Sequence, residues 1–241
     1  MFDKYSKEDL KLLKNLYPNN YDEQIEKLKN DYPIQYLIGY VNFYGYKINV
    51  NENVLIPRFE TEYLVDDTIN LINKYIKEPT IIDIGTGSGC IAISLAKELN
   101  TSVDALDISS NAIKLAKENA ILNNANIKFI CEDIKNYISN KKYNVLISNP
   151  PYVNINSYVD NETKYEPQNA IFANDNGLEY YKIILDKSKD LLDDTNIIAF
   201  EIGDNQANDI INIIKLYYPK ANIITKNDLN NLNRYIYIIN E

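Results

Sequence analysis

An apolar segment that runs into a glycine-rich loop is the feature that most constrains this chain. Residues 81–84 are apolar apart from one aspartate, and Gly85, Gly87 and Gly89 follow at alternate positions, directly before the apolar stretch that begins at Cys90. Glycine lets a backbone turn sharply and lets a ligand approach it closely. A strand that turns through such a loop into a helix is typical of α/β proteins that bind a ligand at the carboxyl ends of parallel strands.

Strand and helix patterns alternate beyond about residue 60, which predicts the same architecture for most of the chain. The expected strands cover residues 80–84, 102–107, 127–131, 143–148, 196–202, 222–225 and 235–239. The expected helices include residues 61–76, 90–99 and 111–122. Strands separated by helices imply right-handed crossovers and a mostly parallel, doubly wound sheet. The short connection between the last two strands predicts an antiparallel strand at one side of this sheet.

The first sixty residues predict a smaller unit in front of the sheet. Two short helices are expected over residues 6–16 and 21–30, because Pro18 and the two asparagines after it favour a turn. Residues 36–50 are rich in Tyr, Phe, Val and Ile around two glycines, which predicts a β-hairpin. The expected divisions are a helical unit at residues 1–34, a hairpin linker at 35–58 and an α/β domain at 59–241.

Composition argues against several classes of function. The net charge is −9, and no run of Lys and Arg is dense enough to follow a DNA or RNA backbone, so direct nucleic-acid binding is not expected. The chain has no histidine, and Cys90 and Cys131 lack metal-ligand spacing, which excludes a zinc finger and a His triad; no metal is expected. No apolar stretch reaches membrane-spanning length and no signal peptide opens the chain, so a cytoplasmic protein without membrane contact is expected.

The spacing of the glycine loop indicates which ligand it holds. Dinucleotide-binding loops follow G-x-G-x-x-G, whereas this loop reads G-x-G-x-G after Asp83. A carboxylate there suits an ammonium group, as in the methionine part of S-adenosylmethionine, better than a diphosphate. Asp107 ends the next strand, where it can accept both ribose hydroxyls. Asp133 and Ile134 follow the third strand, where they can take the adenine amino group and pack on its ring. The predicted cofactor-binding residues are Asp83, Gly85, Thr86, Gly87, Ser88, Gly89, Asp107, Asp133, Ile134 and Asn149.

A second motif, Asn149-Pro150-Pro151-Tyr152, directly follows the fourth predicted strand. The Asn149 side-chain carbonyl and the Pro150 backbone carbonyl can accept both protons of an NH2 group and aim its nitrogen at an electrophilic methyl. The prolines stiffen the loop. The motif therefore predicts methyl transfer to a planar nitrogen through orientation, without a strong base. Tyr152 is expected to pack on the substrate amide near the cationic sulfur. The predicted catalytic residues are Asn149, Pro150 and Tyr152, and the predicted substrate-binding residues are these three with Pro151, Arg58 and Glu166.

These features have other interpretations. An isolated Asn-Pro-Pro-Tyr sequence is more often a rigid turn with a packed tyrosine, and a lone carboxylate is often a strand-end or cap residue. Their order along the predicted strands favours a site. The same geometry would serve an exocyclic amine of adenine in DNA or RNA, although this acidic chain lacks a basic recognition domain. A noncatalytic S-adenosylmethionine-binding module is a further alternative, and the glycine spacing disfavours nicotinamide-dependent oxidoreduction.

Motifs along most of the chain resemble one family of enzymes. They are PIQYLIG at residues 33–39, LIPRFETE at 55–62, GTGSG at 85–89, SNPPY at 148–152, YEP at 165–167, DNGL at 175–178 and EIG at 201–203. The chain resembles the S-adenosylmethionine-dependent protein glutamine N-methyltransferases that modify peptide chain release factors. The resemblance implies a seven-stranded class I methyltransferase domain, Rossmann-like, behind a small helical domain that contacts the release factor.

The resemblance also implies a substrate and a role. Members of this family methylate the side-chain amide of the glutamine in the Gly-Gly-Gln loop of a release factor, releasing S-adenosylhomocysteine and supporting translation termination. A monomer whose protein partner is a release factor is therefore expected. Three features depart from the family pattern: Phe59 replaces a usual proline, Ile134 stands where a larger or aromatic residue often covers the adenine, and the N-terminal helical unit is shorter. The first two leave the chemistry intact, and the third concerns how the partner docks.

Overall fold

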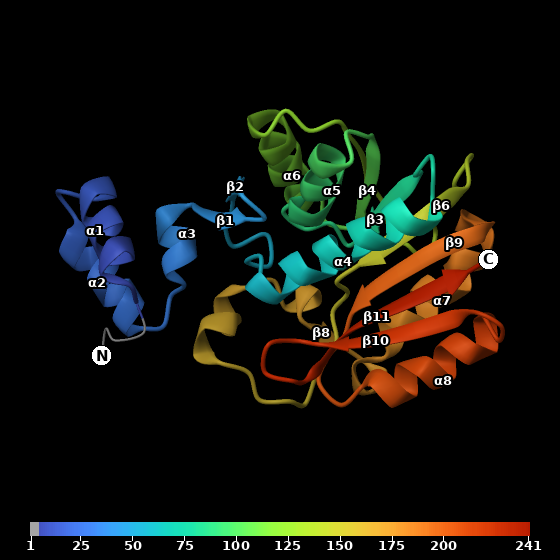
Figure 1. Cartoon of the computed structure of the whole chain (residues 1–241). Helices are drawn as coiled ribbons and strands as arrows, with labels where there is room; N and C mark the ends of the chain where they lie inside the picture. Colours follow the sequence, from blue (N-terminus) through green and yellow to red (C-terminus); the bar gives the residue numbers. More distant parts are fainter. Residues whose placement is uncertain (1–4) are drawn as a thin grey trace.

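A seven-stranded sheet forms the centre of the protein in this computed structural model, which describes residues 5–241 (Figure 1). Its strands are β3 (Ile81–Ile84), β4 (Val103–Asp107), β5 (Ile127–Cys131), β6 (Tyr143–Ser148), β9 (Leu192–Glu201), β10 (Asn222–Asn227) and β11 (Asn233–Asn240). They lie in the order β10-β11-β9-β6-β3-β4-β5, and β11 alone pairs antiparallel, with both of its neighbours. The predicted mostly parallel α/β sheet is confirmed, and its antiparallel strand lies one place inside the edge.

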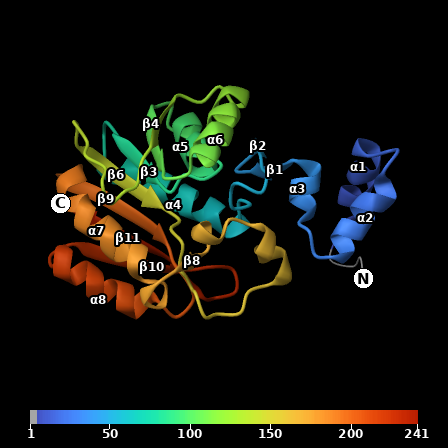
Figure 2. The ribbon, with the colours of Figure 1, turned by 180° about the vertical axis from the view of Figure 1, so that it is seen from behind.

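Helices cover both faces of the sheet. One face carries α4 (Phe59–Tyr75), α5 (Cys90–Glu98) and α6 (Ser110–Leu122), and the other carries α7 (Glu179–Leu191) and α8 (Ala207–Tyr217) (Figures 1 and 2). Successive side chains of a strand point to opposite faces. On β3, Ile81 accordingly joins the core beneath α4 and α5, while Ile82 joins the core beneath α7 and α8. Within residues 5–241, no helix has the length and apolar character needed to cross a membrane.

The N-terminal part consists of α1 (Lys7–Leu16), α2 (Tyr21–Lys29) and α3 (Ile34–Ile38). Figures 1 and 2 place α1 and α2 at one end of the molecule, far from the sheet. A small core of their own holds these helices together, made of Leu13, Leu28, Ile34 and Leu37. Ser6 begins α1 by accepting a hydrogen bond from the Asp9 N–H at 2.9 Å through its hydroxyl.

Helix α3 corrects the expectation that a hairpin begins at residue 36. The helix occupies residues 34–38 and ends at Gly39, whose φ of 86° is the left-handed conformation that glycine adopts without a Cβ penalty. The hairpin begins only after this glycine, with β1 (Tyr40–Phe43) and β2 (Tyr46–Asn49) paired antiparallel. The apolar residues between positions 34 and 49 therefore form a short helix first and two strands after it.

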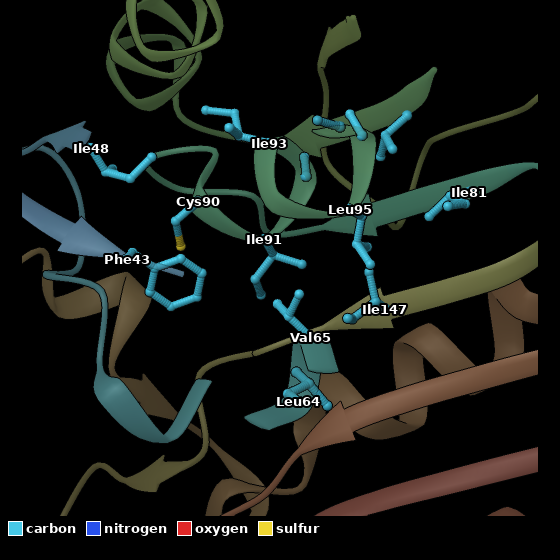
Figure 3. Close-up of a cluster of buried hydrophobic side chains, with 14 of the residues drawn as sticks. Phe43, Ile48, Leu64, Val65, Ile81, Cys90, Ile91, Ile93, Leu95 and Ile147 are labelled. Carbon is cyan, nitrogen blue, oxygen red and sulfur yellow. The ribbon is translucent and has the colours of Figure 1, made fainter. Parts of the chain in front are cut away.

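The hairpin shares a core with the sheet. Phe43 and Ile48 are buried beside Cys90 and Ile93 of α5 (Figure 3). Asn119 of α6 makes two hydrogen bonds to the backbone of Asn49 in β2. Its Nδ2 donates to the Asn49 carbonyl at 3.0 Å, and its Oδ1 accepts from the Asn49 N–H at 2.8 Å. These contacts fix the hairpin, and the extended stretch after it, against the helices that flank the glycine loop.

The segment between β6 and α7 is built from short turns. It contains a two-residue parallel pair, β7 (Val153–Asn154) with β8 (Phe172–Ala173), and tight helical turns around residues 161–165, 168–170 and 175–177. The sequence pattern predicted no element here, because strands and helices this short carry no periodicity. The segment covers the carboxyl ends of the central strands, where it encloses the cavities described next.

Candidate active site

Two cavities meet at the carboxyl ends of the parallel strands. The first has a volume of about 240 Å³ and lies beyond the ends of β3, β4 and β6. The second has a volume of about 300 Å³ and lies beside the segment that follows β6. Both are lined by Leu55, Asn149, Pro150 and Ala170. Asn149 and Pro150 therefore stand where the two cavities join, an arrangement that suits a reaction between two bound molecules.

The first cavity gathers most of the residues predicted to bind the cofactor. Its lining includes Gly85, Gly87, Asp107, Asp133, Ile134 and Asn149. The remaining predicted residues are buried and line neither of the two cavities: Asp83, Thr86, Ser88 and Gly89. Gly85 and Gly87 of the loop therefore face the first cavity, while Thr86, Ser88 and Gly89 are buried.

The glycine loop is pinned to the neighbouring strand. The N–H groups of Gly85 and Thr86 donate to the Leu106 carbonyl of β4 at 2.8 and 3.0 Å. Gly85 and Gly87 have φ values of 74° and 54°, in the left-handed region that favours glycine, and a Cβ on either would meet no atom within 4 Å. Glycine is needed here for its backbone conformation, and the open space beside it is cavity.

Asp83 holds the loop from below. Its Oδ2 accepts a hydrogen bond from the Thr86 hydroxyl at 2.6 Å, and its buried Oδ1 has no hydrogen-bond partner within the described residues. Burial raises the pKa of Asp83 to about 7, and the bond from Thr86 offsets only part of that rise. This buried carboxyl lies directly before the glycine loop, whose Gly85 and Gly87 line the first cavity.

Asp107 combines an anchoring role with a place on the cavity wall. Its Oδ2 accepts from the Gly87 N–H and its Oδ1 from the Ser109 N–H, both at 2.8 Å. Burial raises the pKa of this carboxyl, and the two backbone bonds lower it. A carboxylate has about four acceptor positions, so Asp107 can still accept from two hydroxyls of a ligand. Ile134, 5% exposed, forms an apolar wall nearby. The lining therefore fits a nucleoside that carries a cationic group.

The Asn149 side chain is held through its NH2 end. Its Nδ2 donates to the Thr61 hydroxyl of α4 at 3.2 Å, and its Oδ1 makes no hydrogen bond within residues 5–241. Pro150 is buried beside it, and the Ser148 hydroxyl ties the end of β6 to β3 by donating to the Ile84 carbonyl at 2.7 Å. The Asn149 acceptor is thus available at the junction of the two cavities.

Tyr152 lies on the wall of the second cavity and not on that of the first. Its hydroxyl donates to Glu201 Oε1 at 3.3 Å, and its backbone carbonyl accepts from Gln206 Nε2 at 3.0 Å. Burial, together with the nearby Glu201 carboxylate, raises the pKa of Tyr152 well above its usual value, so the hydroxyl stays protonated and acts as a donor. Pro151, predicted to contact the substrate, lines the first cavity instead.

Arg58 and Glu166 form an ion pair at the edge of the second cavity. Arg58 Nη2 lies 2.5 Å from Glu166 Oε1, and Glu166 Oε2 accepts from the Ile56 N–H at 3.0 Å. Arg58 lines the second cavity, whereas Glu166 is 4% exposed and lines neither. The pair fastens the segment after β6 to the stretch before α4.

Glu201 is the site residue to which sequence reasoning gave no role. It ends β9 with 2% of its surface exposed, and its Oε2 accepts from the Thr61 hydroxyl at 2.6 Å. Burial raises the pKa of Glu201, opposed by the bond from Thr61 and by the charge of Arg234. Its position in the sequence could have identified it. Glu201 lies near the end of the fifth predicted strand, which places it at the same edge of the sheet as Asp107 and Asn149.

Comparisons with known proteins agree with this geometry. A family model described as the methyltransferase small domain matches residues 61–166. The chain is 39% identical over 226 residues to the release factor glutamine methyltransferase of Flavobacterium psychrophilum, which covers 90% of this chain and 79% of that protein. It is 43% identical over 195 residues to the protein of the same name from Fusobacterium nucleatum, which covers 78% of this chain and 55% of the relative, so the chain spans about half of that protein.

A solved structure supports the fold. The hMettl16 catalytic domain, crystallised in complex with the MAT2A 3'UTR hairpin 1, aligns with a TM-score of 0.63 at 21% identity, over 81% of this chain and 75% of that one. This likeness concerns the fold alone, which is that of a class I methyltransferase. The sequence relationship to the Flavobacterium protein extends over most of both chains. The chain therefore belongs to the release factor glutamine methyltransferase family.

Proposed function

We propose that this protein transfers a methyl group from S-adenosylmethionine to the side-chain amide nitrogen of the Gly-Gly-Gln glutamine in a peptide chain release factor. The observation that carries the proposal is the place of Asn149 and Pro150 at the junction of the two cavities. Two acceptors at that point suit an NH2 group that enters from one cavity and meets a methyl group held in the other. The names of the relatives supply the substrate class.

The first cavity is the proposed cofactor site. S-adenosylmethionine bound there supplies the electrophilic methyl group. Gly85 and Gly87 allow close approach of the backbone, and Asp83 beneath them balances the positive charge of the ammonium group. Asp107 accepts the ribose hydroxyls. Asp133 and Ile134 take the amino group and the ring of the adenine.

The second cavity is the proposed glutamine site. Asn149 Oδ1 and the Pro150 carbonyl accept the two amide protons and hold the nitrogen with its lone pair toward the methyl group. An amide nitrogen is a weak nucleophile, so orientation supplies most of the rate enhancement, up to about 7 to 11 kcal/mol for a well-aligned pair. With the cofactor in the first cavity, the two carbonyls would stabilise the positive charge that develops on the amide nitrogen as it accepts the methyl group, until one proton is lost to solvent.

Methylation of an adenine amine is the second candidate, and the chain does not favour it. A flipped base needs a site that grips a phosphate backbone. The second cavity contains one arginine, Arg58, which is paired with Glu166, and it also contains Asp160 and Glu201. With a net charge of −9, the protein offers little attraction to a polyanion.

Transfer of labelled methyl groups tests the proposal. The purified protein would be given labelled S-adenosylmethionine with an intact release factor, with the same factor carrying Gln→Ala in its Gly-Gly-Gln motif, and with adenine-containing DNA and RNA. Label on the intact factor alone is expected. Label on nucleic acid would move the protein to the adenine class, and cofactor binding without any transfer would indicate a noncatalytic module.

Replacing Asn149 identifies the group responsible. Asn149→Ala is expected to reduce kcat by at least about a hundredfold, because the amide nitrogen loses one of its two positioning acceptors. The dissociation constant for S-adenosylmethionine should change by less than about threefold, since the other lining residues remain. Asn140→Ala is a matched control at an exposed asparagine outside both cavities. Turnover by Asn149→Ala equal to that of the control would refute the assignment.

A further inference from the structure

A chain of hydrogen bonds runs from Asn149 into the interior of the protein. Asn149 Nδ2 donates to Thr61 Oγ1 at 3.2 Å, and Thr61 Oγ1 donates to Glu201 Oε2 at 2.6 Å. The Tyr152 hydroxyl donates to the other oxygen of the same carboxylate at 3.3 Å. Four residues from α4, β9 and the loop after β6 are thereby joined, and Thr61 and Glu201 are only 3% and 2% exposed.

The carboxylate sets the direction of every bond in this chain. An ionised carboxylate can only accept hydrogen bonds, so both hydroxyls must donate to Glu201. Thr61 has one proton, and a short bond to a charged acceptor is the strongest use of it. The remaining lone pairs of Thr61 Oγ1 can therefore only accept. Asn149 must then turn its NH2 group toward Thr61, which leaves its carbonyl oxygen facing the cavities.

The alternative orientation of Asn149 would be unproductive. If the side-chain amide were flipped by half a turn, its NH2 group would face the NH2 group of the substrate, and two donors cannot bond to each other. The carbonyl oxygen of Asn149 would meanwhile meet the acceptor lone pairs of Thr61. One proton, on the Thr61 hydroxyl, thus decides whether the site offers an acceptor or a donor to the incoming nitrogen.

We propose that Thr61 and Glu201 are positioning residues that fix the Asn149 amide with its oxygen toward the substrate nitrogen. The proposal rests on the function proposed above, because it assumes that the substrate presents an NH2 group. It also explains why a carboxylate is buried at the end of β9. Burying a charge is costly without a partner, and no ion pair of Glu201 lies within residues 5–241. The side chain of Arg234 instead bonds to Asp228 and to the Ile202 carbonyl.

Two substitutions at residue 61 separate the role of the hydroxyl from that of shape. Thr61→Val keeps the branched side chain and removes the hydroxyl, whereas Thr61→Ser keeps the hydroxyl and removes a methyl group. Thr61→Val is expected to lower kcat by about tenfold to a hundredfold, the cost of a misplaced reacting group, with KM for the release factor changed less than kcat. Thr61→Ser should stay within about threefold of the wild type. Equal kcat for Thr61→Val and the wild type, or equal damage from both changes, would overturn the proposal.

A measurement on the resting protein keeps the proposal testable without turnover. Nuclear magnetic resonance of the Asn149 side-chain NH2 group should show one proton protected from solvent exchange in the wild type and in Thr61→Ser, with the protection lost in Thr61→Val. Unchanged protection in Thr61→Val would contradict the bond on which the inference depends. If the wild type transfers no methyl to any release factor, the proposed function fails, whereas this measurement still decides whether Thr61 orients Asn149.

If Thr61→Val does not fold, Glu201→Gln takes its place. The amide is the same size as the carboxylate, so both hydroxyls keep a partner, but its NH2 group can donate to Thr61 and the fixed direction of the bonds is lost. A fall in kcat of about tenfold is expected, with unchanged affinity for S-adenosylmethionine and a melting temperature near that of the wild type. A kcat equal to that of the wild type would overturn the proposal.

Discussion

Asn149 and Asp107 are each held in place by hydrogen bonds to the protein, and each still offers acceptor positions to the cavities. Asn149 bonds to Thr61 through its NH2 group and leaves its oxygen to the cavities. Asp107 bonds to two backbone N–H groups and still faces the first cavity with free acceptor positions. A side chain held in this way loses little further freedom when a ligand binds, so a larger part of the interaction energy appears as affinity or rate.

Asp83 should make the stability of the protein depend on pH. Its pKa is about 7 in the folded protein, where burial and the nearby Asp107 carboxyl raise it and the bond from Thr86 lowers it, and 3.8 in an unfolded chain. The folded state therefore keeps a proton that the unfolded state has lost. This contribution to stability is fully present below about pH 4 and is lost as the pH rises to about 7, at about 1.4 kcal/mol for each pH unit.

Denaturant unfolding without cofactor, from pH 5 to pH 7.5, measures this contribution. Asp83→Asn removes the titrating group and should flatten the fall of the unfolding free energy with pH. Asp186→Asn, on an exposed carboxylate of α7, is the control and should keep the slope of the wild type. Identical slopes for Asp83→Asn and the wild type would show that Asp83 does not bind the extra proton.

Single residues were predictable from sequence where they end a predicted strand. Asp107 ends the second predicted strand and Asn149 directly follows the fourth, and the carboxyl ends of parallel strands share one edge. The partnership of Thr61 with Glu201 was not predictable. The two residues lie 140 positions apart, and the bond between them depends on how α4 crosses the sheet. No pattern within a sequence window contains that information.

Elements around the site are held at their ends. Helix α4 begins at Phe59, and its first turn meets the sheet twice: the Thr61 hydroxyl bonds to β9, and the Glu60 carbonyl accepts from the Tyr235 hydroxyl of β11 at 2.8 Å. A helix that precedes the sheet in sequence therefore contacts two of the last three strands of the sheet in sequence, β9 and β11. Its N-terminal turn is fixed from both strands, which places Thr61 under Asn149.

Gly89 should matter to the packing of α5 against α6 more than to the cofactor. It has a φ of 84°, and a Cβ would lie 3.1 Å from Ala116 Cβ on α6. Gly45 has a similar φ of 80°, but no atom lies within 4 Å of such a Cβ. Gly45→Ala should cost about 1 to 2 kcal/mol of unfolding free energy for the left-handed conformation alone. Gly89→Ala should cost about 1 to 3 kcal/mol more, because α6 must move.

Denaturant unfolding of the two glycine variants provides the comparison. The difference between them reports the steric contact, since the backbone strain is nearly the same in both. Equal destabilisation would mean that α6 yields without cost, and that Gly89 is required only for its conformation.

The boundaries of elements were predictable where an apolar run was flanked by polar or turn-forming residues. The strands at residues 127–131 and 143–148 have their predicted limits, because polar residues and turns flank apolar runs on both sides. Residues 36–38 were assigned to the hairpin with the Tyr-, Phe-, Val- and Ile-rich stretch that follows them, yet they belong to a helix that Gly39 ends. Local composition cannot decide between a helix turn and a strand of five residues, so packing on Leu13 and Leu28 decides.

At the scale of the whole molecule, the N-terminal helices have a hydrophobic core separate from the two cores of the sheet. The hairpin belongs to a core of the sheet through Phe43 and Ile48, as does Tyr36 of α3, while α1, α2 and the remaining apolar residues of α3 form their own cluster. Contacts between the N-terminal part and the segment after β6 are both polar and aromatic: the Tyr165 hydroxyl donates to the Asn30 carbonyl, Asn161 bonds to Asp31, and the Tyr165 ring lies edge-on to Tyr32 with centroids 5.0 Å apart. We propose on this basis that the helices up to residue 34 open independently of the rest of the chain.

Leu13→Ala tests this division. Leu13 is fully buried in the small core, so its truncation should cost about 2 to 5 kcal/mol, enough to unfold α1 and α2 locally. Hydrogen exchange in these helices should accelerate while β3 and β6 stay protected, and the affinity for S-adenosylmethionine should not change. Leu16→Ala, at a half-exposed position of the same helix, is the control. Loss of protection in the sheet of Leu13→Ala would show that the chain unfolds as one unit.

The two cavities take their walls from different kinds of structure. The ends of the central strands supply much of the first, whereas the short turns between residues 153 and 171 supply a large part of the second. The strand ends cannot change without disturbing the sheet, while surface turns tolerate insertion and replacement. Substitutions and insertions in the exposed segment 153–171 can therefore change which molecule the second cavity accepts. The first cavity, which depends on the strand ends, would keep its shape and its ligand.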